Sequence, residues 1–205
     1  MARLLAVVAL ALGWSGPAMA RTFENCAHRD LKIADAAIVG ALDLTLRAAA
    51  AVGDTTEFTA WFGVFSGGHG EAVRANLKAI HVELVADEVK AVCLGPQVID
   101  CKDGTYAYVL FDRPRVIHLC PSFFAMPTMA DARRGRGDME NGTREGTIIH
   151  EMSHFPFIAG TEDECYSRSV CGGLARTDAA RVVRNADSYQ YFAEDVMLLF
   201  LSKDG

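Results

Sequence analysis

The chain has 205 residues, of which 51% are hydrophobic and 22% are charged, and its formal net charge is −6. This length suits one ordinary globular domain, and the hydrophobic fraction is too high for a disordered chain. The acidic balance argues against a nucleic-acid-binding protein, whose binding surface would be basic.

Residues 1–20 have the pattern of a secretory signal peptide. Arg3 gives a basic start, residues 4–12 are apolar, and Ala18-Met19-Ala20 matches an A-x-A cleavage site. An N-terminal core helix is the alternative, but nothing polar interrupts the apolar stretch. The stretch is short for a membrane span, and no second one follows. We therefore expect residues 21–205 to form one exported domain, secreted or periplasmic, with no stable membrane association after signal removal.

All six cysteines lie after the predicted signal peptide. In an oxidising compartment, an even number of cysteines indicates disulfides, here three of them. The absence of a C-x-x-C pair argues against a zinc ribbon or a thioredoxin-like redox site. Spacing alone does not choose among the possible pairings of Cys26, Cys93, Cys101, Cys120, Cys165 and Cys171.

The first part of the exported domain has helical periodicity. Residues 26–52 carry apolar side chains at helical spacing, and Gly53 follows as a stop signal. The aromatic segment 55–65 predicts a shorter helix, and the GGHG sequence at 67–70 predicts a break. Residues 70–91 repeat the helical pattern.

The character of the sequence changes after Gly95-Pro96. The segments 97–101, 106–111 and 115–120 are short and rich in β-branched or aromatic residues, which predicts a small antiparallel sheet or hairpin. Residues 121–127 and 130–146 read as loops. Helical patterns resume at 147–155, 172–184 and 188–201. The expected fold class is α+β, mostly α, with three disulfides.

The predicted helix at 147–155 contains the motif H-E-x-x-H. Positions i and i+4 share one helix face, so His150 and His154 can bind one metal ion. Glu151 stands beside the first of these ligands, where its carboxylate can take a proton from a metal-activated water. The alternative is an ordinary helix with two incidental histidines.

A catalytic zinc ion needs a third protein ligand. The extended pattern H-E-x-x-H-x-x-G-x-x-H fails, because Phe157 and Gly160 stand at its last two defined positions. Glu194 is one candidate for the third ligand. The nearer candidate is the acidic run Glu162-Asp163-Glu164. Pro156 ends the helix and Gly160 lets the chain turn back beneath the site, so that Asp163, nine residues after the second histidine, can reach the metal.

Tyr166, three residues after Asp163, has a phenol that can donate a hydrogen bond to a developing oxyanion. Without the two histidines, the same segment would read as an acidic surface loop with a packed tyrosine.

HEMSHF at 150–155 followed by GTEDECY at 160–166 resembles the signature of the aspzincin metallopeptidases, H-E-x-x-H plus G-T-x-D-x-x-Y. This family comprises deuterolysin and the peptidyl-lysine metalloendopeptidases. Further segments similar to lysine-specific members are TAWFG at 59–63, TYAYV at 105–109, VIHLC at 116–120 and NADSYQYFAE at 185–194. The resemblance extends in order through nearly all of the predicted mature chain and implies a zincin-like metalloprotease domain.

The resemblance also assigns roles to individual residues. It implies that one zinc ion is bound by His150, His154 and Asp163. Glu151 is then the general base, and Tyr166 stabilises the tetrahedral intermediate.

The resemblance further implies the disulfides Cys26–Cys93 and Cys101–Cys120, which leaves Cys165 to pair with Cys171. This last pair closes a short loop beside Tyr166, where it either fixes the phenol or simply joins the ends of the loop.

Two positions depart from the family pattern. Ser167 follows Tyr166 where the family has glycine, so the local turn can differ. Lysine-specific members carry an aspartate and a glutamate three residues apart that form an acidic pocket for the substrate lysine. This chain has Asp187 and Gln190 there, which share a helix face and imply a weaker electrostatic preference for lysine. The alternative role for Asp187 is a helix N-cap.

The resulting hypothesis is a monomeric, exported zinc endopeptidase that acts on protein or peptide substrates and prefers the bond before a lysine. The remaining alternatives are a zinc peptidase of broader specificity, an amidase of the same fold, and a relative that binds zinc or peptides without catalysis. A structural metal site closed by a fourth protein ligand is a further alternative.

Overall fold

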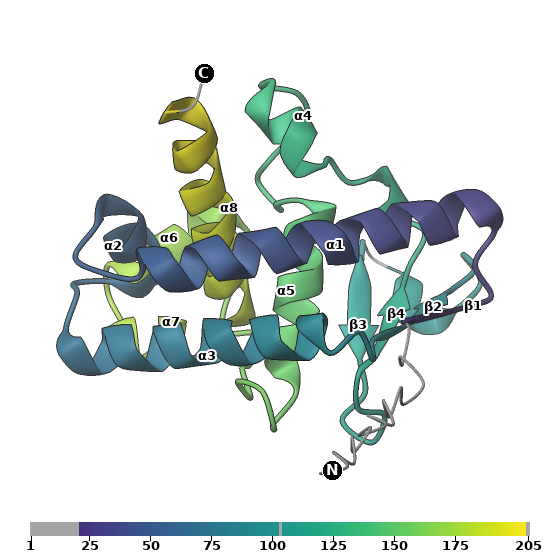
Figure 1. Ribbon diagram of the computed structural model, residues 1–205, viewed down its shortest axis with the longest axis horizontal. Coiled ribbons are helices and arrows are strands. Elements are labelled where there is room, and N and C mark those ends of the chain that lie inside the picture. Colours follow the sequence, from purple (N-terminus) through teal and green to yellow (C-terminus); the bar gives the residue numbers. More distant parts are fainter. Residues whose placement is uncertain (1–20, 103, 204–205) are drawn as a thin grey trace, which may run out of the picture.

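The computed structural model describes residues 21–102 and 104–203, so the predicted signal peptide lies outside the described residues. Helices dominate the fold (Figure 1), as the periodicity predicts. Their bounds are α1 His28–Ala51, α2 Thr56–Phe62, α3 Gly67–Val85, α4 Met129–Arg133, α5 Arg144–His154, α6 Arg168–Ala175, α7 Ala179–Val182 and α8 Ala186–Lys203.

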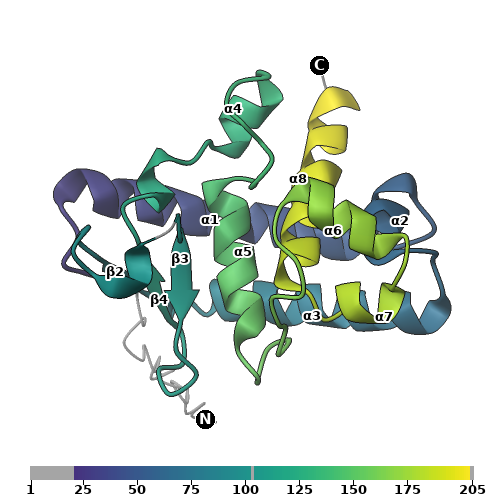
Figure 2. The same ribbon diagram turned by 180° about the vertical axis from the view of Figure 1, so that it is seen from behind.

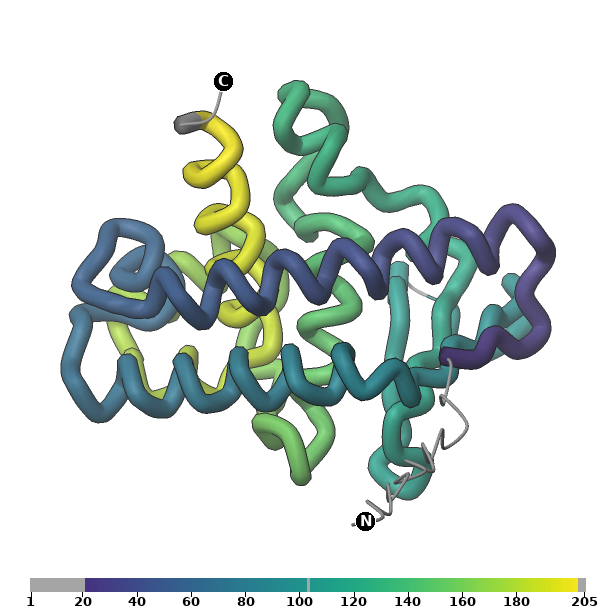
Figure 3. Tube along the Cα trace, in the orientation of Figure 1, coloured from purple at the N-terminus to yellow at the C-terminus, as the bar shows by residue number. Residues whose placement is uncertain are grey.

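The long helices α1 and α3 lie side by side and cross α5 and α8 (Figures 1 and 3). The prediction of a helix over 26–52 is confirmed by α1. The prediction for 67–70 is wrong, because these glycine-rich residues begin α3. The Ser66 hydroxyl accepts a hydrogen bond from the backbone N–H of His69 at 3.3 Å, and this N-cap starts the helix despite the glycines.

Four short strands form one sheet with the order β1-β2-β4-β3, where β1 is Thr22–Glu24, β2 Lys90–Cys93, β3 Ala107–Val109 and β4 Val116–Leu119. The sheet is mixed, which corrects the prediction of an antiparallel one. Only β3 and β4 pair antiparallel. β1 and β2 run parallel because the chain returns to the sheet after the helices α1–α3, and β2 and β4 run parallel because the 3-10 helix and β3 lie between them in the chain. The segment 97–101, predicted as a strand, contains the 3-10 helix Ile99–Cys101 instead.

The three disulfides pair as the family resemblance implies. Cys26–Cys93 ties the segment after β1 to the end of β2, and Cys101–Cys120 ties the 3-10 helix to the residue after β4. Cys165–Cys171 ties the loop that follows α5 to α6, which contains Cys171. Disulfides therefore crosslink the segments at one end of the sheet and anchor the loop after α5.

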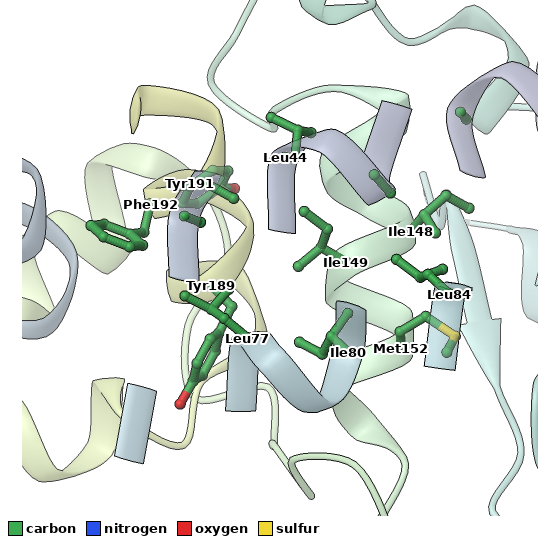
Figure 4. Packing of buried hydrophobic residues seen from close by; sticks show 14 of the residues in the cluster. Leu44, Leu77, Ile80, Leu84, Ile148, Ile149, Met152, Tyr189, Tyr191 and Phe192 are labelled. Carbon is green, nitrogen blue, oxygen red and sulfur yellow. The ribbon is translucent and has the colours of Figure 1, made fainter. Parts of the chain in front are cut away.

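One hydrophobic core joins α5 to the surrounding helices (Figure 4). Ile148, Ile149 and Met152 on α5 are fully buried. They lie among Leu44 from α1, Leu77, Ile80 and Leu84 from α3, and Tyr189, Tyr191 and Phe192 from α8. Because close packing resists small displacements, α5 is held firmly by its apolar face, and its other face is free to carry polar side chains.

Within residues 21–102 and 104–203, no single helix is both long and apolar enough to cross a membrane. Among the helices described, the pair α1 and α2 taken together passes that test, but the two are bent by 104° at the break between them.

Candidate active site

Helix α5 carries the H-E-x-x-H motif, and its bounds follow from local chemistry. The Thr143 hydroxyl accepts a hydrogen bond from the Gly146 N–H at 3.0 Å and caps the N-terminus. The helix ends at His154, two residues before Pro156, as predicted. Its apolar face enters the core, so its other face presents His150, Glu151 and His154 to a pocket.

The side chains of His150, His154 and Asp163 converge. Their ligand atoms all lie within 4.8 Å of one another. Asp163 Oδ1 is 3.2 Å from His150 Nε2 and 3.4 Å from His154 Nε2, and the two Nε2 atoms are 3.1 Å apart. Two imidazoles and one carboxylate facing a common point are the three-ligand donor set of a catalytic zinc site, so these residues fit the metal. Asp163, rather than Glu194, completes the cluster.

Hydrogen bonds to the other ring nitrogens fix both imidazoles. His150 Nδ1 is 2.7 Å from Asp187 Oδ1, and His154 Nδ1 is 3.0 Å from the backbone oxygen of Thr161. Both partners are acceptors, so each Nδ1 carries the proton and each Nε2 offers its lone pair to the common point. The link between Asp187 and His150 is a feature that sequence reasoning did not find, because 37 residues separate the two.

The loop that carries Asp163 turns back beneath α5, as predicted from Pro156 and Gly160. Gly160 has a φ of +59°, in the region that favours glycine. The Thr161 N–H then donates to the Ser153 carbonyl at 3.1 Å. Further along, Asn185 Oδ1 accepts hydrogen bonds from the N–H groups of Glu164 and Cys165. These contacts hold the loop between α5 and the start of α8.

The remaining predicted groups line one pocket with a volume of about 710 Å³. Besides the three metal-binding side chains, it is lined by the segment 104–109, Phe111, Asn141, Tyr166, Gln190 and Tyr191. Glu151 also lines it and is 4% exposed, whereas Tyr166 is 60% exposed. A buried carboxylate and an accessible phenol therefore lie around the histidine cluster.

Burial and neighbouring charges shift the pKa values of these groups. Burial raises the pKa of Glu151, which moves this carboxyl toward the range of a general base. Partial burial and the nearby Asp163 carboxylate raise the pKa of Tyr166, so its phenol stays protonated and can donate a hydrogen bond. Burial opposes ionisation of Asp163, but in the metal-free site the His150 and His154 imidazoles, when protonated at Nε2, outweigh it with hydrogen bonds and positive charge and lower the pKa of that carboxyl.

Asp187 and Gln190, the predicted substrate-binding pair, both line the pocket. Asp187 is 5% exposed, and besides His150 its carboxylate accepts hydrogen bonds from the Ser167 N–H at 3.0 Å and the Tyr191 hydroxyl at 2.9 Å. Its contacts are those of a group that supports a metal ligand. Gln190 Nε2 donates to the Asn141 carbonyl at 3.2 Å and to Glu194 Oε1 at 3.3 Å.

Ser167, the departure from the family pattern, has φ +71° and ψ 151°. Glycine adopts this conformation readily, whereas a serine is strained in it. The turn therefore has a backbone conformation that favours glycine, although a serine occupies the position.

The comparisons agree with this geometry. A family described as lysine-specific metallo-endopeptidase, of aspzincin type, matches residues 47–194. An extracellular protease of Aeromonas hydrophila is 34% identical over 140 residues, which cover 67% of this chain and 35% of that protein. A peptidyl-Lys metalloendopeptidase of Pleurotus ostreatus is 32% identical over 144 residues, covering 69% of this chain and 74% of that protein.

Among solved structures, a zinc peptidase from Grifola frondosa superimposes with a TM-score of 0.70 at 24% identity, covering 83% of this chain and 97% of that chain. This likeness confirms the expected fold. The matched region is about a third of the length of the Aeromonas protein, so this chain corresponds to only part of that relative.

Proposed function

The chain belongs to the aspzincin family of lysine-specific metallo-endopeptidases, and on that premise we propose that it is an exported zinc endopeptidase that hydrolyses the bond before a lysine. The observation that carries the proposal is the convergence of His150, His154 and Asp163 in one pocket with Glu151 and Tyr166. We propose one zinc ion per chain, a monomer, and no stable membrane association.

Each residue of the site has a role in hydrolysis. A zinc ion bound by the two histidines and Asp163 would polarise a carbonyl and lower the pKa of water. Glu151 takes the proton of the attacking water and later passes it to the leaving amine, since its carboxylate lines the same pocket as the three metal-binding side chains. The Tyr166 phenol donates a hydrogen bond to the oxyanion that develops on the scissile carbonyl.

The sheet supplies a place for an extended substrate. Strand β3 is an edge strand that packs beside α5, and its residues line the pocket. An edge strand has one row of backbone N–H and C=O groups free to pair with a peptide. A substrate bound along β3 therefore lies across the side chains of α5.

The proposed preference for lysine depends on Gln190, which lines the pocket. Both hydrogen-bond partners of its Nε2 are acceptors, so the nitrogen faces them and the Oε1 atom is left as an acceptor for the pocket. The buried Glu194 carboxylate holds the Nε2 atom and is itself paired with Arg168. The carbonyl oxygen is therefore the negative end of a dipole, and it attracts an ammonium group less strongly than a carboxylate in the pocket would.

The test is a casein digest by wild type and Glu151→Gln, with mass spectrometry of the new N-termini. We expect wild-type products to begin with lysine, and the variant to be slower by a factor of about 10² to 10⁴. Glu162→Gln is the control, since this exposed side chain lies next to Asp163 and outside the pocket. A Glu151→Gln variant as active as wild type would refute the mechanism. Cleavage with no lysine preference would refute only the specificity.

A further inference from the structure

Arg168, two residues after Tyr166, has an extensive set of contacts for one side chain. Its guanidinium lies 5.3 Å from the centre of the Trp61 ring and 4.8 Å from that of Tyr191. It also forms ion pairs with Glu194 Oε2 at 2.6 Å and Asp195 Oδ1 at 2.7 Å. These contacts connect α6, where Arg168 is the first residue, to α2 and α8, against which α6 packs (Figure 2).

Glu194 carries the connection on to the site helix. Its side chain is fully buried, and its Oε1 atom accepts hydrogen bonds from the Thr143 N–H at 2.7 Å and the Thr143 hydroxyl at 2.8 Å. Thr143 is the N-cap of α5. One carboxylate therefore joins the turn that follows Tyr166 to the N-terminus of the helix that carries His150 and Glu151.

The backbone between Tyr166 and Arg168 is held from both sides. The Ser167 N–H donates to Asp187 Oδ2 at 3.0 Å, and the Arg168 N–H donates to the Glu140 carbonyl at 2.8 Å. Ser167 lies in a glycine-type conformation that costs a serine free energy, so such a turn persists only where its surroundings fix it. The contacts of Arg168 help to hold this turn in place.

We propose that Arg168 is a positioning residue for hydrolysis, which sets the phenol of Tyr166 relative to α5 through its ion pair with Glu194. The inference rests on the proposed function, in which Tyr166 contacts the reacting carbonyl. Arg168 touches neither substrate nor metal ligands in this account. Its fork of donors engages two carboxylates at once, a geometry that a lysine ammonium cannot reproduce.

The test is a double-mutant cycle with Arg168→Lys, which keeps the charge and removes the fork. In the wild-type background we expect kcat to fall about tenfold or more, with KM changed less than about twofold. In a Tyr166→Phe background the same substitution should change kcat less than about twofold, because no phenol remains to be positioned. Equal losses in both backgrounds, or no loss in the first, would overturn the proposal. The matched control is Arg47→Lys, a surface arginine that pairs with Asp43 and stacks on Phe200.

A second readout does not depend on activity. The chain has five tyrosines, so fluorotyrosine labelling gives a short fluorine NMR spectrum in which Tyr166→Phe identifies one line. In the metal-free protein, Arg168→Lys should shift or broaden that line, and Arg47→Lys should leave it unchanged. An unmoved Tyr166 line in Arg168→Lys would overturn the positioning role. A wild-type enzyme that hydrolyses no peptide, with the line still moved, would instead contradict the proposed function alone.

Discussion

Asp187→Asn separates two roles for this residue, support of a metal ligand and contact with a substrate lysine. In the structure one carboxylate oxygen faces His150 Nδ1 at 2.7 Å, and the other accepts from the Ser167 N–H and the Tyr191 hydroxyl. An asparagine has only one acceptor oxygen. If that oxygen stays with His150, the new amide N–H₂ faces the Ser167 N–H, which loses its partner.

The expected magnitudes follow from these contacts. Loss of a carboxylate behind a metal-binding histidine lowers metal affinity by about 10- to 100-fold, or about 1.4–2.7 kcal/mol. The Ser167 N–H left facing another donor costs about 1–3 kcal/mol of folding free energy. A residue that served only the substrate lysine would leave metal affinity unchanged and raise KM for substrates with lysine after the scissile bond.

The assay is zinc competition against a chromophoric chelator, with urea unfolding of the metal-free protein. We expect Asp187→Asn to show both losses, and Asp43→Asn to show neither, because Asp43 is a surface partner of Arg47. Zinc affinity of Asp187→Asn within twofold of wild type would refute the supporting role.

Three further predictions concern stability and specificity. Ser167→Gly should raise the free energy of unfolding by about 1 kcal/mol in urea titrations, since glycine adopts φ +71° without strain. A decrease in that free energy would show that the turn is not strained. Burial lowers the pKa of His118, which is 5% exposed, so the unfolded state binds more protons as the pH falls below about 6.5. Wild type should therefore lose more unfolding free energy between pH 7 and 5 than His118→Phe, and equal losses would contradict this. Gln190→Glu should increase the preference for lysine over alanine about fivefold in peptide mapping. It should also lower the free energy of unfolding in urea by about 1–2 kcal/mol, because the new carboxylate lies beside Glu194. An unchanged preference would show that Gln190 does not contact the substrate lysine.

The part of the site that sequence could predict is the part made by local structure. Helix α5 follows from 3.6-residue periodicity and from Pro156 after His154. The turn expected from Pro156 and Gly160 makes Asp163 the nearer candidate for the third ligand but leaves Glu194 open, and the family motif then assigns roles to Asp163 and Tyr166. The disulfide pairings likewise came from resemblance.

The contacts that join distant segments could not be predicted in this way. β1 and β2 pair although helices α1, α2 and α3 separate them in the chain. The sequence does not predict β2, because the helical pattern of α3 continues into residues 86–91. The ion pair between Arg168 and Glu194 and the contact between Asp187 and His150 depend on how α6 and α8 pack against α5. Side-chain pairs of this kind are set by tertiary packing and leave no local pattern.

The most direct test of a zinc endopeptidase is the titration of metal-depleted wild-type protein with zinc while peptide hydrolysis is followed. The three-ligand cluster predicts that hydrolysis is lost on chelation and returns to a plateau at one zinc ion per chain. Hydrolysis that survives complete removal of zinc, or one zinc ion bound per chain with no hydrolysis of any peptide, would contradict the account.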